Sequence, residues 1–221
     1  MRFIASALIS LIICSVLGFG LSHRVSERER DLAKLGRLLF EEGHEGGFVP
    51  YRNPEDTPQA IEELSALESL DLSYTQLSEF PPGIEYLTNL QKLRLQYTSL
   101  NELPPEITQL SSLRDLYLNQ TQLSVLPPEI GQLASLEALY LSDTPISELP
   151  PEIGQLSSLQ RLTLHNTQLY EIPPEIGQLT SLESLWLQHT HISELPSEIG
   201  YLSNLNYLMD KSKRSRLKYN G

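Results

Sequence analysis

The chain has 221 residues, of which 40% are hydrophobic, and it carries a formal net charge of −12. A chain of this length can bury a substantial core, and its single cysteine excludes an intramolecular disulfide framework. The sequence contains no glycine-rich phosphate loop and no C-x-x-C, H-E-x-x-H or G-x-S-x-G motif, so the common signatures of nucleotide, zinc and serine-hydrolase sites are excluded.

The first feature along the chain is an apolar run. Residues 3–21 are 19 residues without a charged side chain, between Arg2 and Arg24. As a helix the run is long enough to cross a bilayer, and it also has the charged start and apolar centre of a signal peptide. It lacks an A-x-A cleavage motif, which favours a retained anchor. We interpret residues 1–22 as an N-terminal apolar helix, either signal anchor or signal peptide, and expect the protein in a membrane or exported after cleavage.

The orientation of such an anchor stays open. Five basic residues follow the run, from Arg24 to Arg37, and only Arg2 precedes it. By the positive-inside rule, this asymmetry keeps the rest of the chain in the cytoplasm. Export of the remaining chain would require cleavage or an exception to the rule.

Residues 23–66 are predicted to hold a helix, a linker and an N-terminal cap. Ser26 and Glu29 have the spacing of a capping box, and the helix would run to about Glu42 with a leucine stripe on one face. Residues 43–58 contain glycines and prolines without periodicity, which indicates a linker or an irregular cap. Residues 58–66 match the back half of a degenerate repeat, which would cover the end of a solenoid.

From residue 67 the sequence repeats itself. A leucine opens each copy at a step of 23 residues: Leu67, Leu90, Leu113, Leu136, Leu159, Leu182 and Leu205. Self-similarity at this period indicates a stacked solenoid, in which each copy buries the hydrophobic face of its neighbours. We expect six full copies and a partial seventh over residues 67–209, followed by a basic tail at residues 210–221.

The copy at residues 136–158 shows how each unit should fold. Leu139 and Leu141 alternate with other positions, which predicts a short strand with both leucines facing inward. On the other side of that strand we expect side chains that point outward: Ala138, Tyr140 and Ser142. Pro150 and Pro151 end the strand because proline has no N–H to donate, and they suit entry into a helical turn. The chain would then return to the next strand in parallel.

These copies resemble the leucine-rich repeat family. The family pattern L-x-x-L-x-L-x-x-[N/C]-x-L is similar to six successive segments, among them LRDLYLNQTQL and LEALYLSDTPI. The second half of the copy, LPPEIGQL, resembles the 23-residue class of Ras-group-related plant proteins and many bacterial proteins, with its L-P-x-x-I-x-x-L motif. The resemblance implies an α/β solenoid: a leucine-rich-repeat arc with a parallel β-sheet on the concave face and short helical or extended turns on the convex face.

One departure from the family pattern is systematic. Threonine replaces the family's asparagine in six copies: Thr75, Thr98, Thr121, Thr144, Thr167 and Thr190. In the family, the asparagines tie the loops of adjacent repeats together. A threonine hydroxyl has one donor where an amide has two, so we expect a hydroxyl ladder between repeats that does the same job less fully.

Charge is unevenly distributed along the chain. Residues 67–204 contain 17 acidic and 4 basic residues, a net charge of −13. Much of the excess lies in two columns of glutamates, which we interpret as a solvated face: Glu79, Glu102, Glu148, Glu171 and Glu194 in one, and Glu106, Glu129, Glu152, Glu175 and Glu198 in the other. Because phosphates require basic partners, the repeats are not expected to bind nucleic acid.

The strand face that points away from the core varies most between copies, at the fifth and eighth positions. Aromatic rings on a solvent-facing sheet indicate a contact surface, although aromatic residues also suit strands for structural reasons. The candidate partner-binding residues on the concave face are Asp71, Tyr74, Arg94, Tyr97, Tyr117, Tyr140, Arg161, His165, Trp186 and His189.

Histidines supply the one cluster with the composition of a catalytic site, at His165 and His189 with Asp143 and Asn166 nearby. A metal or acid–base site needs converging groups, which a flat strand surface seldom supplies. We therefore assign no catalytic or metal-binding residue and expect no cofactor.

The function expected from the sequence is non-catalytic binding of a protein or peptide on the concave face, with a membrane as a second partner through residues 3–21. Two alternatives stay open. One is a scaffold or adhesive surface protein without one specific partner, and the other, more remote, is a hydrolase that uses His165 and His189. The oligomeric state stays open as well.

Overall fold

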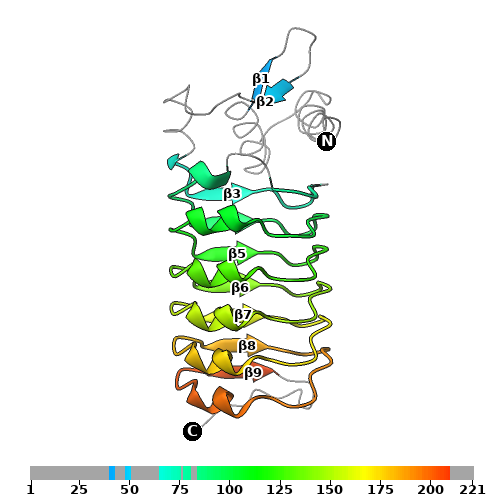
Figure 1. The fold of residues 1–221 in the computed structure, drawn as a ribbon, viewed down its shortest axis with the longest axis vertical. Coiled ribbons are helices and arrows are strands. Elements are labelled where there is room, and N and C mark those ends of the chain that lie inside the picture. The colour runs from blue at the N-terminus through cyan, green and yellow to red at the C-terminus, as the bar shows by residue number, and fades with distance from the viewer. Residues whose placement is uncertain (1–39, 43–47, 51–64, 76, 81–83, 210–221) are drawn as a thin grey trace, which may run out of the picture.

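The computed structural model describes residues 40–42, 48–50, 65–75, 77–80 and 84–209 (Figure 1). The apolar run at residues 3–21, most of the predicted helix and cap at residues 23–66, and the basic tail lie outside the described residues. Within the described ranges, no helix has both the length and the apolarity needed to cross a membrane.

In the described part of the chain, seven three-residue strands form one parallel sheet, one strand from each copy of the repeat (Figure 1). They stack in sequence order: β3 (Ser69–Asp71), β4 (Lys92–Arg94), β5 (Asp115–Tyr117), β6 (Ala138–Tyr140), β7 (Arg161–Thr163), β8 (Ser184–Trp186) and β9 (Tyr207–Met209). The register follows the repeat, because Leu116 pairs with Leu139 and Leu139 pairs with Leu162. The predicted parallel stacking of the copies is confirmed.

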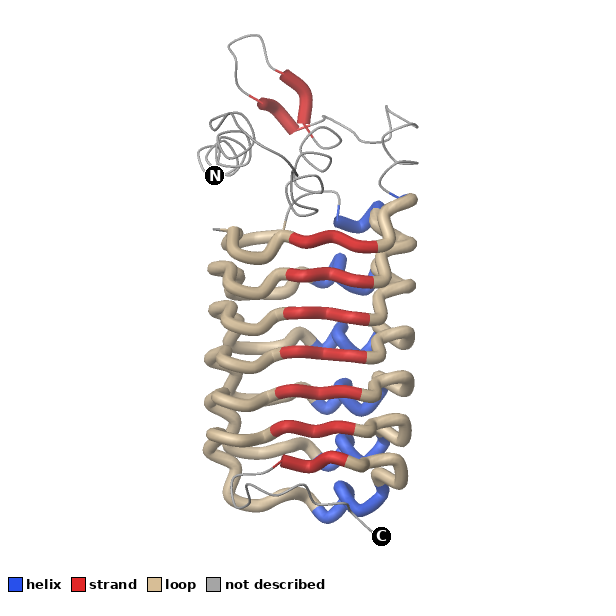
Figure 2. Tube along the Cα trace, turned by 180° about the vertical axis from the view of Figure 1, so that it is seen from behind, coloured by secondary structure: helices blue, strands red, loops and turns tan. Residues whose placement is uncertain are grey.

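The opposite side of the solenoid is built from 3-10 helices (Figure 2): η2 (Ile84–Tyr86), η3 (Pro105–Gln109), η4 (Pro128–Gln132), η5 (Pro151–Gln155), η6 (Pro174–Gln178) and η7 (Ser197–Tyr201). We call it the turn side. Pro150 precedes η5 with an extended backbone, at φ −68° and ψ 146°, and Pro151 opens the helix. Proline suits this position because the first N–H of a helix has no intrahelical partner. The predicted helical turns are confirmed in the tighter 3-10 form.

Leucine and isoleucine side chains fill the space between the sheet and the 3-10 helices as one continuous cluster. In the copy at residues 136–158, seven aliphatic side chains expose between 0% and 6% of their surface: Leu136, Leu139, Leu141, Ile146, Leu149, Ile153 and Leu156. Burying a side chain of this size contributes roughly 1.5–3 kcal/mol. Since neighbouring copies cover this core, the stability of the solenoid is shared between copies.

Main-chain hydrogen bonds continue beyond the strands and tie each copy to the next. Leu118 N donates to Tyr140 O at 2.8 Å, and Gln120 N donates to Ser142 O at 3.0 Å. The predicted threonine ladder between copies is wrong, because the Thr121 hydroxyl donates to Leu118 O of its own copy at 2.9 Å. The other five threonines make the same local contact at 2.6–2.9 Å. The residue before each of them has a left-handed backbone, and a short hydroxyl at that bend reaches the carbonyl of its own turn first.

Glycine lets the 3-10 helices of neighbouring copies approach closely. A Cβ atom on Gly131 would lie 2.5 Å from Glu152 O, and one on Gly154 would lie 2.5 Å from Glu175 O. Side chains do not tolerate such a distance to a backbone oxygen, so a residue with a Cβ atom would push the copies apart. The close packing of the turn side from η4 to η7 therefore depends on this glycine.

Two short strands earlier in the sequence lie at the end of the predicted helix and inside the predicted linker or irregular cap. β1 (Phe40–Glu42) pairs antiparallel with β2 (Phe48–Pro50). The predicted helix therefore does not reach Glu42, and the predicted linker at residues 43–58 contains a strand. The phenylalanines and Val49 favour strands, and the three glycines within residues 43–47 are typical of a connection between paired strands.

Candidate functional site

The strand register brings the fifth-position residues together as one row across the sheet. Asp71 pairs in register with Arg94, and Arg94 pairs with Tyr117. The row continues in the same way through the later strands: Tyr140, Thr163, Trp186 and Met209. We call these seven residues the sheet-face row. They alternate with the buried leucines, so they lie on the face of the sheet that points away from the core.

Side-chain contacts link the sheet-face row from β3 to β7. Arg94 lies 3.9 Å from Asp71, and its guanidinium lies 5.5 Å from the centre of the Tyr117 ring. Tyr117 and Tyr140 stack, with ring centres 4.5 Å apart and 8° between the ring planes. Arg161 Nη1 donates to Tyr140 Oη at 3.2 Å. These contacts hold the rings in place, which lowers the entropy lost when a partner packs against them.

The same neighbours raise the pKa values of Tyr117 and Arg161. Burial raises the pKa of the Tyr117 phenol, and the nearby Asp115 and Tyr140 raise it further. The hydrogen bond to Tyr140 raises the pKa of the Arg161 guanidinium. Near neutral pH the Tyr117 phenol is therefore neutral and the Arg161 guanidinium is charged.

The eighth-position residues lie in a turn, which corrects the prediction that they extend the strand face. Each has a left-handed backbone with φ between 55° and 59°: Tyr74, Tyr97, Gln120, Asp143, Asn166 and His189. This conformation costs a non-glycine residue roughly 1–2 kcal/mol, and asparagine, aspartate and histidine occur in it most often. Tyr74 and Tyr97 nevertheless occupy it, 60% and 44% exposed, with ring centres 4.3 Å apart in a stack.

Thr163 separates two large rings of the sheet-face row, Tyr140 on β6 and Trp186 on β8. Trp186 is 38% exposed, and its ring centre lies 6.0 Å from that of His165. Thr163 has a much smaller side chain than Tyr140 or Trp186. It exposes only 5% of its surface, so its neighbours leave little open space above it in the free protein.

Two small residues that were expected to point into solvent are buried. Ala138 exposes 2% and Ser142 exposes 0% of its surface. Ser142 Oγ lies 2.9 Å from Thr163 Oγ1 and 2.9 Å from His165 Nδ1. Ala138 lies in register between two longer side chains, which shield its methyl group. Outward orientation therefore does not guarantee exposure when the neighbouring side chains are larger.

The histidine cluster is less connected than the sequence suggests. In the described residues, His165 and His189 share no hydrogen bond or ring contact. Ser142 and His165 have the spacing of a nucleophile and its base, but Ser142 exposes 0% of its surface. Asp143 accepts a hydrogen bond from Asn166 Nδ2 at 2.7 Å. No group of three His, Cys, Asp or Glu side chains in the described ranges could hold a metal ion.

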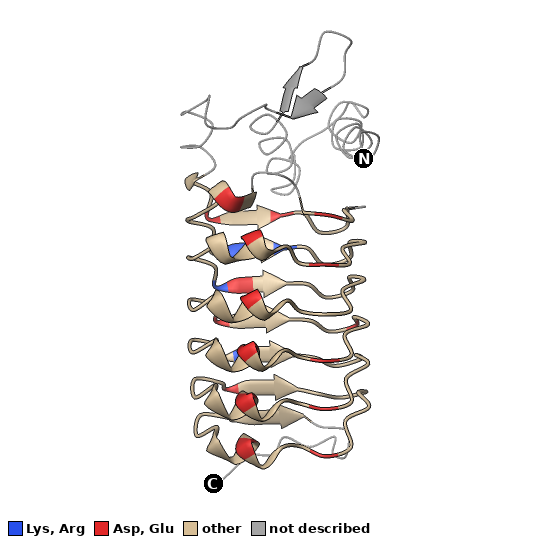
Figure 3. Ribbon diagram, viewed as in Figure 1, with Lys and Arg blue, Asp and Glu red and all other residues tan. Residues whose placement is uncertain are grey.

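In the described residues, lysine and arginine lie on the sheet side alone, whereas aspartate and glutamate lie on both sides of the solenoid (Figure 3). The four basic residues of the described ranges lie on strands or directly before one, and three of them form ion pairs there: Lys92 with Asp115 at 3.5 Å, Arg94 with Asp71 at 3.9 Å and Arg114 with Glu137 at 3.0 Å. On the turn side, the glutamate column that includes Glu148 is exposed as predicted. The column that includes Glu152 is mostly half-buried at the start of the 3-10 helices, where a carboxylate is favoured.

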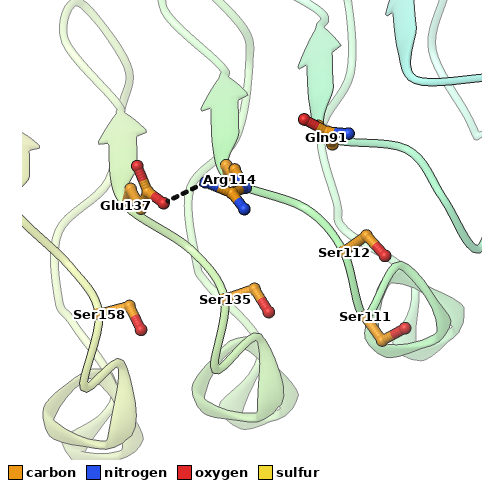
Figure 4. A pocket seen from close by; sticks show the side chains of 7 residues that line it. All are labelled: Gln91, Ser111, Ser112, Arg114, Ser135, Glu137 and Ser158. Carbon is orange, nitrogen blue, oxygen red and sulfur yellow. Dashed lines mark hydrogen bonds and ion pairs between the residues drawn. The ribbon is translucent and has the colours of Figure 1, made fainter.

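A polar hollow of about 390 Å³ lies where the chain passes from the 3-10 helices into the strands (Figure 4). It is lined by Gln91, Ser111, Ser112, Arg114, Ser135, Glu137 and Ser158. The prediction from sequence missed this surface, although serine recurs at the last position of the copies. Arg114 and Glu137 form an ion pair in the hollow, and its other lining side chains offer hydrogen-bonding groups.

The candidate residues therefore fall into two groups along one surface. Six lie on strands: Asp71, Arg94, Tyr117, Tyr140, Arg161 and Trp186. Four lie in the segments that follow the strands: Tyr74, Tyr97, His165 and His189. Their assignment to partner binding stays a prediction.

Comparisons with known proteins agree on one family. A family model described as leucine-rich repeat region matches residues 106–185, and a second, described as leucine-rich repeat, matches residues 66–87 and 181–202. No curated protein matches the chain.

Solved structures of three organisms are similar to the chain. A leucine-rich-repeat protein from Leptospira interrogans is 35% identical, with a TM-score of 0.59, over 72% of this chain and 46% of its own. A second similar structure is the leucine-rich-repeat ectodomain of a plant membrane receptor kinase from Arabidopsis thaliana, in complex with Casparian strip integrity factor 2. It is 38% identical, with a TM-score of 0.59, and the match covers 69% of this chain and 19% of the ectodomain chain. An internalin from Listeria monocytogenes is 23% identical, with a TM-score of 0.58, over 69% and 44%, and supports the fold alone. The chain spans less than half the length of each.

Proposed function

Because this chain belongs to the leucine-rich repeat family, we propose that it is a non-catalytic module that binds a protein or peptide on the face of its parallel sheet. Members of the family are typically binding modules without enzymatic activity. The observation that carries the proposal is the continuous surface of aromatic rings and arginines across the sheet. Tyrosine, tryptophan and arginine are the residue types that dominate binding energy at interfaces.

The geometry of that surface supports the proposal. The rings of Tyr117 and Tyr140 are fixed by stacking, and Tyr74 and Tyr97 occupy a backbone conformation that other residues would adopt at lower cost. Their stacked rings are 60% and 44% exposed, so a partner could pack against them. The receptor-kinase ectodomain in complex with Casparian strip integrity factor 2 supports partner binding by a related repeat domain.

We also propose that residues 3–21 tether the module to a membrane or direct its export. The support is the run of 19 residues without a charge, which suits either role. In its native host, the full chain should fractionate with membranes, or appear outside the cytoplasm with a new N-terminus near residues 21–23. Recovery of the uncleaved chain as a freely soluble cytoplasmic protein would contradict both roles.

A finer assignment within the family is part of the proposal. The step of 23 residues and the recurring LPPEIGQL segment support the class with an L-P-x-x-I-x-x-L turn side. In this chain, threonine would stand where the class has asparagine. Its hydroxyl donates to a carbonyl oxygen of its own copy, as Thr121 does to Leu118 O.

Selection from a random peptide library on the full chain tests the binding function. Peptides that bind saturably should lose affinity for Trp186→Ala, whose ring lies on the sheet face. They should bind equally to Tyr201→Ala, which removes a 70% exposed ring from the turn side. Weak, unsaturable binding to many unrelated peptides would favour a scaffold or adhesive element instead, and an absence of binding would contradict the proposal.

A further inference from the structure

One cation on the sheet face differs from the others in the described part of the chain. Lys92, Arg94 and Arg114 each lie within 4 Å of a carboxylate, at 3.5, 3.9 and 3.0 Å. Among the described residues, no carboxylate lies within 4 Å of the Arg161 guanidinium. Its side chain donates instead to the hydroxyl oxygen of Tyr140 at 3.2 Å, which is a hydrogen bond and not an ion pair with a carboxylate.

Arg161 retains the capacity to bind an anion. A guanidinium has five N–H donors in a planar fork, and the contact with Tyr140 uses one of them while it fixes the orientation of the group. The side chain is exposed in the middle of the sheet. Asp115 and Glu183 act on Arg161 through their charge and help to raise its pKa, but neither forms an ion pair with it.

A large apolar side chain, that of Trp186, lies close to Arg161 on the same face of the sheet. Thr163 follows Arg161 by two residues on β7 and pairs in register with Trp186 on β8. Neighbouring strands lie about 4.8 Å apart, and the rise along a strand is about 3.3 Å per residue. The Cα atoms of Arg161 and Trp186 are therefore roughly 8 Å apart, and both side chains leave the same face of the sheet. Side chains two residues apart in an extended peptide span a similar distance. The indole of Trp186 is partly exposed and rests against His165 at 6.0 Å.

On the basis of the proposed function, we propose that the partner is a peptide segment that places a carboxylate on Arg161 and an apolar side chain, about two residues away, on Trp186. A single carboxylate matches the single unpaired guanidinium and its fork. A multiply charged group such as a phosphate would meet repulsion from Asp115 and Glu183, since the repeats are acidic overall. The carboxylate is supplied either by an Asp or Glu side chain or by the C-terminus of the peptide.

The test uses peptides selected from the random library on the full chain, and measures their affinity for Arg161→Gln. We expect about a tenfold or greater loss, because a charge-assisted pair to the guanidinium disappears. Arg114→Gln is the matched control, since it removes an arginine that is already paired and lies in the polar hollow, and it should bind as wild type does. Arg161→Lys keeps the charge without the fork and should bind with intermediate affinity, which separates recognition from a general loss of structure.

Altered peptides identify the source of the carboxylate. Amidation of the C-terminus abolishes the Arg161-dependent affinity if the terminus binds, and Asp→Asn or Glu→Gln in the peptide abolishes it if a side chain binds. Either result supports the inference. Selected peptides that lose affinity for Trp186→Ala but not for Arg161→Gln would overturn the inference and leave the proposed function intact. If no peptide binds the full chain, both are overturned.

Discussion

The turn side and the sheet side of the solenoid differ in how closely their copies resemble one another. Three successive 3-10 helices, η4, η5 and η6, have the same sequence PEIGQ, and η3 has PEITQ. The sheet-face row changes at almost every step, from Asp71 and Arg94 through two tyrosines to Thr163 and Trp186.

Packing explains why the turn side is uniform. The glycine of each PEIGQ helix lies so near the next copy that a Cβ atom would sit 2.5–2.7 Å from a backbone oxygen. The sheet face has no second layer against it in the described residues, so its side chains are free to differ. The sequences of the 3-10 helices are thus uniform because the copies must stack closely. The sequences on the sheet face differ between copies, which allows that face to recognise a partner. Substitutions on the two sides should therefore separate stability from binding.

The largest expected effect comes from the core that both sides share. Leu139→Asp would bury a charge without a partner at a fully buried position, at a cost of several kcal/mol. Circular dichroism and thermal melting should show a cooperative loss of structure that spreads to neighbouring copies. Leu139→Met is the matched control and should cost less than about 1.5 kcal/mol. An unchanged melting curve for Leu139→Asp would contradict the inward position of this residue.

The turn side should respond strongly to one methyl group. Gly154→Ala places a Cβ atom 2.5 Å from Glu175 O, and overpacking of this kind typically costs about 1–3 kcal/mol. Denaturant unfolding measures the change. Gly200→Ala provides the comparison, because Gly200 has the same position in the last copy and is exposed. Thr108 occupies this position in η3, so equal stability of Gly154→Ala and wild type would mean that the stack adjusts its spacing without cost.

A smaller effect on stability is expected within the sheet-face row. Tyr140→Ala removes the stack on Tyr117 and the acceptor of Arg161, and an aromatic pair contributes about 0.5–1.5 kcal/mol beyond its buried area. Tyr140→Phe keeps the stack and loses only the hydroxyl, so it should unfold closer to wild type. The ring of Tyr140 is half-buried, so its removal should lower the free energy of unfolding. If Tyr140→Phe is as unstable as Tyr140→Ala, the hydrogen bond rather than the stack is the larger contribution.

The smallest effect is expected for the exposed glutamates of the turn side. Glu148→Gln removes one charge from a column in which the described residues contain no ion pair. Relief of like-charge repulsion should change the free energy of unfolding by at most about 0.5 kcal/mol, and added salt should remove the difference. A large or salt-independent change would show that this carboxylate has a specific partner.

The parts of the fold that follow from the period could be predicted from the sequence. The parallel strands and the burial of leucines such as Leu139 and Leu162 depend only on alternation and on the step between copies. The left-handed turn at Tyr97 could not be predicted in this way, because tyrosine carries none of the usual signals for positive φ.

The contacts between particular side chains could not be predicted from the sequence either. The local hydrogen bond of Thr121 and the pairing of Arg161 with Tyr140 depend on which neighbour a side chain reaches first, and a repeat pattern does not encode that choice. The candidate surface was recognised because it varies, but the closed space above Thr163 appears only when the neighbouring side chains are placed.

One pair of measurements tests most directly whether recognition and stacking belong to opposite sides. The dissociation constant of a selected peptide and the melting temperature are measured for Trp186→Ala and Gly154→Ala, at a temperature where circular dichroism shows both variants folded. We predict that Trp186→Ala binds about thirtyfold more weakly, the effect of losing roughly 2 kcal/mol at an aromatic anchor, and melts as wild type does. Gly154→Ala should melt at a lower temperature and bind with unchanged affinity. Equal affinity of Trp186→Ala and wild type would contradict the account and place recognition away from the sheet face.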